Sequence, residues 1–176
     1  MMPQSFVRVL LLGFLLSQSG CSMGASDEIV ILLPGQVKGK PLVLAETSAS
    51  NISINRDLVP SLIVKVWWND SLIITENHPM KLRSKFPGDT YQIPDRTVSC
   101  WYLIHPQTDA VLRIHDRDDL QDKIRQFGVD PQSVDLQPLR RAQALREEEL
   151  GFSFTASSVN RYLQSQRQGN RAQGGQ

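Results

Sequence analysis

The segment "SLIVKVWWNDSLIIT" at 61–75 decides the fold, because two runs of β-branched and aromatic residues flank a polar pair. Asn69 and Asp70 suit a two-residue hairpin turn, whose central positions need positive φ angles. Trp67 and Trp68 are neighbours on the first strand, so their side chains point to opposite faces of the sheet. The sequence therefore predicts a hairpin near 62–75 with one tryptophan on each face.

A second hairpin is expected near 99–115, within "SCWYLIHPQTDAVLRIHD" at 99–116. Its four-residue loop "PQTD" places His105 opposite Ala110 and Cys100 opposite His115. In this register one face carries apolar side chains that we expect to point into the core, namely Trp101, Leu103, Leu112 and Ile114. Tyr102 and Arg113 share the other face.

Further strands and helices are expected around these two hairpins. "IVILLPG" at 29–35 is typical of a buried strand, and 40–55 predicts one or two more. The proline-rich segment 77–96 predicts mainly loop with short edge strands. Three helices follow: one capped by Asp116 or Asp118 and ended by Gly128, one over 138–150, and one from Ala156 to about Gln166. The fold class is therefore α+β, with an antiparallel β-sheet or sandwich core followed by two or three C-terminal helices.

The length of 176 residues suits a single domain with appendages. We expect a signal peptide at 1–20, a tether at 21–28, one domain at 29–165 and a disordered tail at 166–176. The two cysteines, Cys21 and Cys100, form no disulfide framework, so the core depends on apolar packing. The formal net charge of +1 provides no field that would attract nucleic acid, and we expect no such partner.

Residues 1–24 have the pattern of a secretory signal. Arg8 precedes the apolar run "VLLLGFLL" at 9–16, and small and polar residues lead to Cys21. This run is shorter than the roughly 20 apolar residues that span a bilayer. We therefore expect export of the chain.

The ending "SGC" at 19–21 resembles a bacterial lipobox, in which small residues precede a cysteine that becomes acylated. Ser19 and Gly20 match the small positions, whereas Gln18 stands where the motif has leucine. The resemblance implies a diacylglyceryl group and an amide-linked acyl chain on Cys21. Ser22, in place of a retention aspartate, implies the periplasmic face of the outer membrane. The alternative is cleavage after Ser22 or Gly24 and simple secretion.

Catalytic and metal-binding patterns are weak in this sequence. The strongest pair is Cys100 with His115, because a thiol beside an imidazole can act as a nucleophile. The alternative is that Cys100 is a packed thiol of the strand. His78, His105 and His115 lack the spacing of a helical metal site. We expect no cofactor and no metal.

The candidate interaction residues are aromatic and basic. They are Trp67, Trp68, Tyr102, Arg140 and Arg141. Aromatic side chains are enriched at interfaces, and they are also the usual filling of a core. The basic run continues to Arg146 on a helix that is either a solvated face or a docking face for an acidic partner. Sequons at Asn51 and Asn69 keep a secreted glycoprotein open as an alternative.

These observations together favour a non-catalytic, lipid-anchored adaptor of a cell-envelope complex, with protein partners and a membrane anchor. The layout of lipidated cysteine, short tether and β-rich domain resembles the outer-membrane lipoproteins of secretion, pilus or conjugation machines. "VPSLIVKVWW" at 59–68 resembles a strand of the type VI secretion lipoprotein. The alternative function is an envelope enzyme that uses Cys100 and His115.

Overall fold

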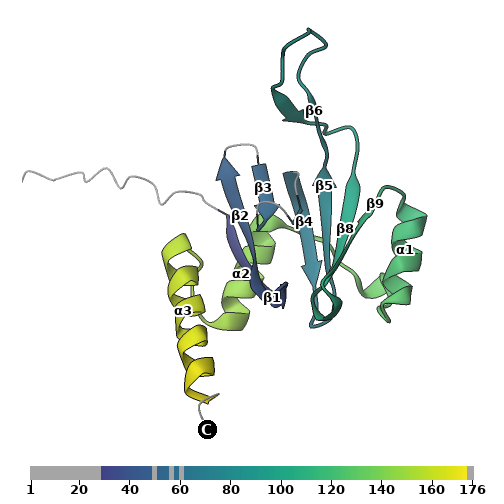
Figure 1. Cartoon of the computed structure of the whole chain (residues 1–176). Coiled ribbons are helices and arrows are strands. Elements are labelled where there is room, and N and C mark those ends of the chain that lie inside the picture. The colour runs from purple at the N-terminus through teal and green to yellow at the C-terminus, as the bar shows by residue number, and fades with distance from the viewer. Residues whose placement is uncertain (1–28, 49–50, 56–57, 60–61, 174–176) are drawn as a thin grey trace, which may run out of the picture.

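The computed structural model describes residues 29–48, 51–55, 58–59 and 62–173. The expected signal peptide and the tether with Cys21 lie outside these residues. All named strand pairs are antiparallel, and the helices follow the main strands, so the predicted α+β class is confirmed (Figure 1).

Three sheets are present in the described part of the chain. The strands of the first are β1 (Val30–Val37), β2 (Lys40–Ser48) and β3 (Asn51–Ile54), in that order. The second has the order β10-β4-β5-β8-β9, formed by Gln137–Pro138, Leu62–Trp68, Ile73–His78, Cys100–His105 and Ala110–Ile114. The third pairs β6 (Met80–Leu82) with β7 (Gln92–Pro94). The helices are α1 (Arg117–Gln126), α2 (Leu139–Leu150) and α3 (Ala156–Gln173), and short 3-10 turns lie at Pro106–Thr108 (η1) and Pro131–Ser133 (η2).

The register of the first predicted hairpin differs from expectation by two residues. A two-residue turn would place Trp68 opposite Ser71, but Trp68 pairs with Ile73 across a longer turn. Asn69 closes that turn: its side-chain oxygen accepts hydrogen bonds from the backbone N–H of Ser71 at 2.9 Å and of Leu72 at 2.8 Å. A shift of two keeps Trp67 and Trp68 on opposite faces, as expected. A bulge between Ile63 and Lys65 then interrupts the alternation, so Ile63 and Val66 are buried on the same side of the sheet.

The β8–β9 hairpin has the expected register, with His105 opposite Ala110 and Trp101 opposite Ile114. Leu112 lies on the expected face but is exposed rather than buried. The reason is that β9 is the edge strand of its sheet.

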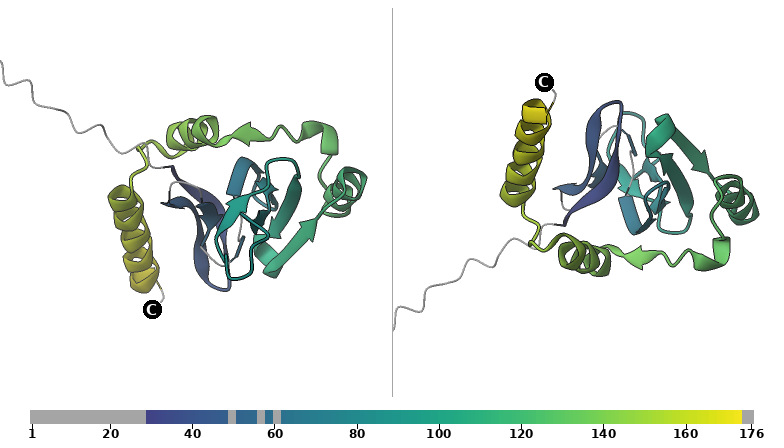
Figure 2. Two further views of the ribbon diagram at one scale, coloured as in Figure 1. Left: turned by 90° about the horizontal axis from the view of Figure 1, so that it is seen from above. Right: turned by 90° about the horizontal axis from the view of Figure 1, so that it is seen from below.

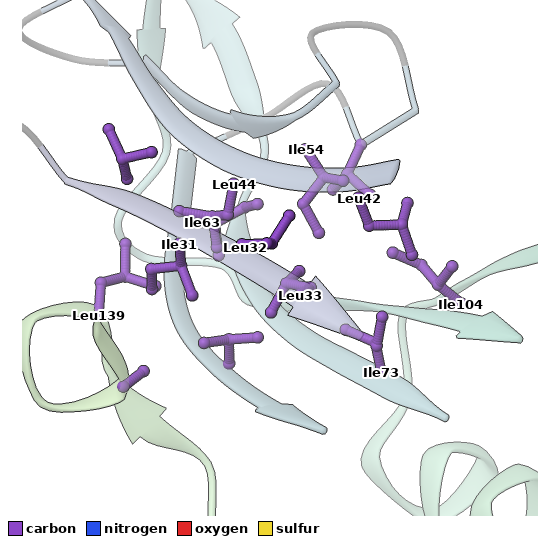
Figure 3. Close-up of a cluster of buried hydrophobic side chains, with 14 of the residues drawn as sticks. Ile31, Leu32, Leu33, Leu42, Leu44, Ile54, Ile63, Ile73, Ile104 and Leu139 are labelled. Carbon is purple, nitrogen blue, oxygen red and sulfur yellow. The ribbon is translucent and has the colours of Figure 1, made fainter. Parts of the chain in front are cut away.

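Two apolar clusters lie on the two faces of the five-stranded sheet. Between this sheet and β1–β3 lies the first cluster, which Figure 3 shows with side chains from both sheets, including Ile31, Leu44, Ile63 and Ile104. On the opposite face the second cluster packs α1, through Leu120 and Ile124, against other strand residues. The views along the vertical axis of Figure 1 show β1–β3 and α1 on opposite sides of the sheet (Figure 2). Burial of both faces explains the apolar character of β5 and β8.

The helix boundaries follow the expected caps, with one exception at the C-terminus. Asp116 is the N-cap of α1, and its carboxylate accepts from the backbone N–H of Asp118 at 2.8 Å. Gly151 ends α2 in the left-handed conformation. Helix α3 continues to Gln173, so the predicted end near Gln166 is too early. The segment 164–173 contains four Gln and two Arg, which are compatible with a helix although they contribute no apolar stripe.

The segment 79–95 projects from one end of the five-stranded sheet as a separate hairpin (Figure 1). It contains β6 and β7, which pair only with each other. The short strands agree with the expectation for this proline-rich segment.

Candidate functional site

The predicted interaction residues occupy different environments. Trp67 and Trp68 are half-buried, Tyr102 is buried, and Arg140 and Arg141 lie exposed on α2. The Tyr102 ring lies 5.8 Å from the guanidinium carbon of Arg113, its cross-strand neighbour. Tyr102 is therefore part of the core and does not offer its ring to a partner, whereas the two tryptophans remain accessible.

The two tryptophans line a hollow at the edge of β4, which we call the edge hollow. Its volume is about 290 Å³, and its walls are Val66, Trp67, Trp68, Asp135, Gln137 and Leu145. The hollow forms because β10 pairs with β4 only at Lys65 and Val66. Beyond these two residues, the edge of β4 faces side chains of α2 and of the segment before β10, including Leu145 and Asp135.

The edge hollow combines apolar walls with a polar rim. Leu145 is 44% exposed, which is unusual for a leucine in a helix that also buries Leu139 and Ala142. The side-chain amide of Gln137 donates to the Asp135 carboxylate and, at 3.2 Å, to the Asp135 carbonyl oxygen. The hollow can therefore receive an apolar side chain whose neighbouring group is a hydrogen-bond donor or a cation.

A second cavity, the α1 cavity, lies beneath helix α1 on the same face of the sheet as Trp67. Its volume is about 310 Å³, and its lining residues are Lys65, Glu76, Trp101, Arg117, Leu120, Gln121, Ile124, Pro131, Val134 and Leu136. Cross-strand pairing brings Lys65 to Glu76, and their Nζ and Oε2 atoms are 2.9 Å apart. The other Glu76 oxygen accepts from the Ser99 hydroxyl at 3.3 Å.

The α1 cavity has mixed walls, in which Lys65, Glu76, Arg117 and Gln121 lie beside apolar side chains. The Glu76 side chain is 18% exposed, and Lys65 and Arg117 contribute cationic groups to the same cavity. Such a cavity suits a small amphipathic group better than a phosphate, because the carboxylate lies within it. Sequence reasoning missed this cavity, since Lys65, Glu76 and Arg117 come together only when the strand register and the α1 position are known.

The expected Cys100 and His115 pair is not assembled as a nucleophile and base. Cys100 is fully buried in the first cluster, whereas His115 is exposed. No hydrogen bond links these two residues in the described part of the chain. A substrate can reach the imidazole but not the thiol, so this geometry does not favour the alternative enzyme.

Two of the three histidines, His78 and His105, make separate contacts. His78 Nδ1 lies 3.0 Å from the Val98 carbonyl oxygen, and His105 Nδ1 lies 3.0 Å from the Thr108 hydroxyl. The His105 ring also stacks on Phe127 at 5.2 Å. Within the described residues, no three His, Cys, Asp or Glu side chains are grouped closely enough to hold a metal ion.

Arg146 is buried rather than part of a docking face. Its Nε donates to the Leu32 carbonyl oxygen at 2.9 Å, and its Nη1 lies 2.6 Å from Glu149. The basic residues of α2 therefore divide: Arg146 connects the helix to β1, and Arg140 and Arg141 remain at the surface.

Sequence reasoning also missed two of the three large apolar side chains of the projecting hairpin, Leu82 and Phe86. Leu82, Phe86 and Tyr91 are exposed there. The available signal was the alternation of apolar and cationic residues in "KLRSKFPGDTY" at 81–91. In the described ranges, no helix is both long and apolar enough to cross a bilayer.

Comparison with known proteins places the chain in a family. The family described as "Protein of unknown function (DUF3997)" matches residues 38–140, a range that includes both main hairpins, the projecting hairpin and α1. No curated protein and no solved structure gave a match. Because the matched range is more than half of the chain, the chain belongs to the DUF3997 family.

Proposed function

We propose that this chain is a non-catalytic, lipid-anchored adaptor of a cell-envelope complex on the periplasmic face of the outer membrane. Acyl chains on Cys21 would hold it at the membrane, and the edge hollow would bind a protein partner. The complex is of the secretion, pilus or conjugation type that the sequence layout resembles. Support for anchoring comes from the apolar run at 9–16 followed by Ser19, Gly20 and Cys21.

The observation that carries the adaptor role is the composition of the edge hollow. Two adjacent tryptophans and an exposed leucine meet there at an open strand edge. Tryptophan is among the residues that contribute most to binding energy at protein interfaces, especially in pockets that exclude water on binding. An extended partner segment with an apolar anchor and a basic neighbour facing Asp135 fits this arrangement.

The anchoring part of the proposal is tested with the variant Cys21→Ala. The unmodified chain should fractionate with outer membranes and show an intact mass that includes three acyl chains. The variant should lose this added mass and leave the membrane fraction, because each buried methylene contributes about 0.8 kcal/mol to membrane binding. A variant that keeps its mass and location would refute lipidation at Cys21.

The adaptor part is tested by comparing Leu145→Glu with Leu112→Glu. Both leucines are exposed to a similar degree, 44% and 38%, but only Leu145 lines the edge hollow. Crosslinking in cells identifies the partner, and its affinity for the purified acylated chain is then measured. Leu145→Glu should weaken binding by roughly tenfold or more, whereas Leu112→Glu should leave it unchanged. Equal effects of the two variants would exclude the edge hollow as the partner site.

A further inference from the structure

The projecting hairpin exposes three large apolar side chains close together in the sequence. Phe86 is 79% exposed, Tyr91 is 59% exposed and Leu82 is 56% exposed. Figure 1 shows the hairpin extending away from the sheets, which agrees with the exposure of these side chains. Exposed apolar side chains grouped in this way indicate a binding surface.

The loop that carries Phe86 is held in one shape by Asp89. The Asp89 carboxylate accepts from the Ser84 hydroxyl at 2.7 Å, from the Tyr91 backbone N–H at 3.0 Å and from the Arg83 guanidinium at 3.1 Å. The Arg83 guanidinium also lies 5.1 Å from the centre of the Tyr91 ring. These contacts fix the local shape of the loop in which Phe86 is exposed.

The solvent-exposed charged side chains of the hairpin are mainly cationic. Its two carboxylates are engaged internally, since Asp89 pairs with Arg83 and Asp95 lies 3.0 Å from Lys81. Lys85 is next to Phe86 and is exposed. Apolar and aromatic side chains beside lysine and arginine are typical of segments that lie in the interface of an anionic bilayer.

The position of the hairpin agrees with the proposed lipid anchor. Strand β1 begins at the end of the molecule from which the hairpin projects (Figures 1 and 2). Residues 22–28 separate Cys21 from Ile29, and a fully extended chain of that length spans roughly 30 Å at most. A bilayer that holds acyl chains on Cys21 therefore lies near this end of the domain. The hairpin arm at 79–86 is about as many residues long as the tether, so its tip can reach that bilayer.

We infer that the tip of this hairpin is a second membrane contact, which enters the interfacial region of the bilayer to which Cys21 is anchored. Phe86, at the tip, occupies the boundary of the acyl chains, and Lys85, Tyr91 and Leu82 lie further from the tip, among the headgroups. Two contacts fix the orientation of the domain on the membrane. This inference rests on the proposed acylation of Cys21.

The test uses the full acylated chain in vesicles of phosphatidylethanolamine and phosphatidylglycerol, with a fluorescent label at Phe86→Cys. Acylation blocks Cys21 and burial protects Cys100, so the new thiol is labelled selectively. Nitroxide-bearing lipids should quench this label severalfold more than a label at Gln107→Cys. Gln107 is exposed in η1, which follows β8 at the end of the sheet where β5 begins, opposite to the hairpin.

Charge reversal provides a second measurement with a matched control. Lys85→Glu should reduce quenching of the label at 86 on anionic vesicles, because the added carboxylate is repelled by the headgroups. Lys123→Glu, on α1 at a distance from the hairpin, should leave quenching unchanged.

The possible outcomes separate the two proposals. If the unmodified full chain is found to carry no acyl chains and fails to float with vesicles, the proposed anchor is refuted, and the hairpin contact is refuted with it. A chain that floats with three acyl chains, but whose label at 86 is quenched no more than the label at 107, refutes only the hairpin contact.

Discussion

At the scale of single residues, hydrogen bonds in and next to the projecting hairpin lower the pKa values of two carboxyl groups, those of Asp89 and Asp95. The Thr97 hydroxyl donates to Asp95 at 2.6 Å, and the Thr97 backbone N–H donates to the same oxygen at 3.2 Å. Together with Lys81, these donors lower the pKa of the Asp95 carboxyl from its ordinary value of 3.8 to about 2. Hydrogen bonds from Ser84 and the Tyr91 backbone similarly lower the pKa of Asp89.

The pKa of Asp95 is expected to rise in Thr97→Val, because the largest stabilising contact of the carboxylate is lost. A carboxyl NMR titration should show a shift from about 2 towards 3.8. In the unmodified chain, this carboxylate stabilises the folded state above pH 3.8, and its contribution is lost as the pH falls towards 2. Thr108→Val is the control, since the Thr108 hydroxyl contacts His105. An unchanged Asp95 pKa in Thr97→Val would assign the effect to Lys81.

At the scale of secondary-structure elements, α1 depends on its N-cap residue, Asp116, and also forms a wall of the α1 cavity. The Asp116 carboxylate accepts from the backbone N–H groups of Asp118 and Asp119, at 2.8 Å and 3.1 Å. Leu120 and Ile124 then hold the helix against the five-stranded sheet. The cap therefore affects both the stability of the domain and the shape of the cavity.

Asp116→Ala should lower the free energy of unfolding by about 1 kcal/mol, the usual loss for an N-cap carboxylate. Urea denaturation of the full chain measures the change. Asp122→Ala is the matched control within α1, because its exposed ion pair with Arg125 is worth less than about 0.5 kcal/mol. Equal losses in the two variants would contradict the capping role.

At the scale of the whole molecule, the two main sheets are joined where their turns meet. Gly35, in β1, has φ +80°, and a Cβ added there would lie 2.6 Å from the Pro106 Cβ. Close by, the Lys38 backbone N–H donates to the Asp109 carboxylate at 2.6 Å. Arg146 makes a further link by bonding α2 to the backbone of β1. The first cluster depends on these contacts between distant segments.

Gly35→Ala should destabilise the domain more than Gly39→Ala. Both glycines have positive φ, but a Cβ at Gly39 has no atom within 4 Å. Conformational strain alone should cost about 1 kcal/mol in Gly39→Ala. The contact with Pro106 should add roughly 1–3 kcal/mol in Gly35→Ala. Chemical denaturation of both variants checks the difference, and losses of equal size would show that the sheets can separate slightly at this junction.

Local physics made much of the architecture predictable from the sequence. The alternation in 62–75 and 99–115, the cap at Asp116 and the terminator Gly151 each act within a few residues. The turn at Asn69 was misjudged by two residues, because its side chain bonds to backbone groups of a longer loop. The faces of the tryptophans survived this error, since a shift of two preserves the side-chain alternation.

The sequence by itself determined the antiparallel hairpins, the order of strands and helices, and the candidate lipid acceptor at Cys21. Only the tertiary structure decided which polar and aromatic groups stay accessible. Arg146 is buried, and it donates a hydrogen bond to a carbonyl group 114 residues away. Lys65 and Arg117 line the same cavity because of the position of α1. Phe86 remains exposed because its hairpin leaves the sheet. Periodicity and caps depend on neighbours along the chain, whereas burial and cavities depend on segments that only folding brings together.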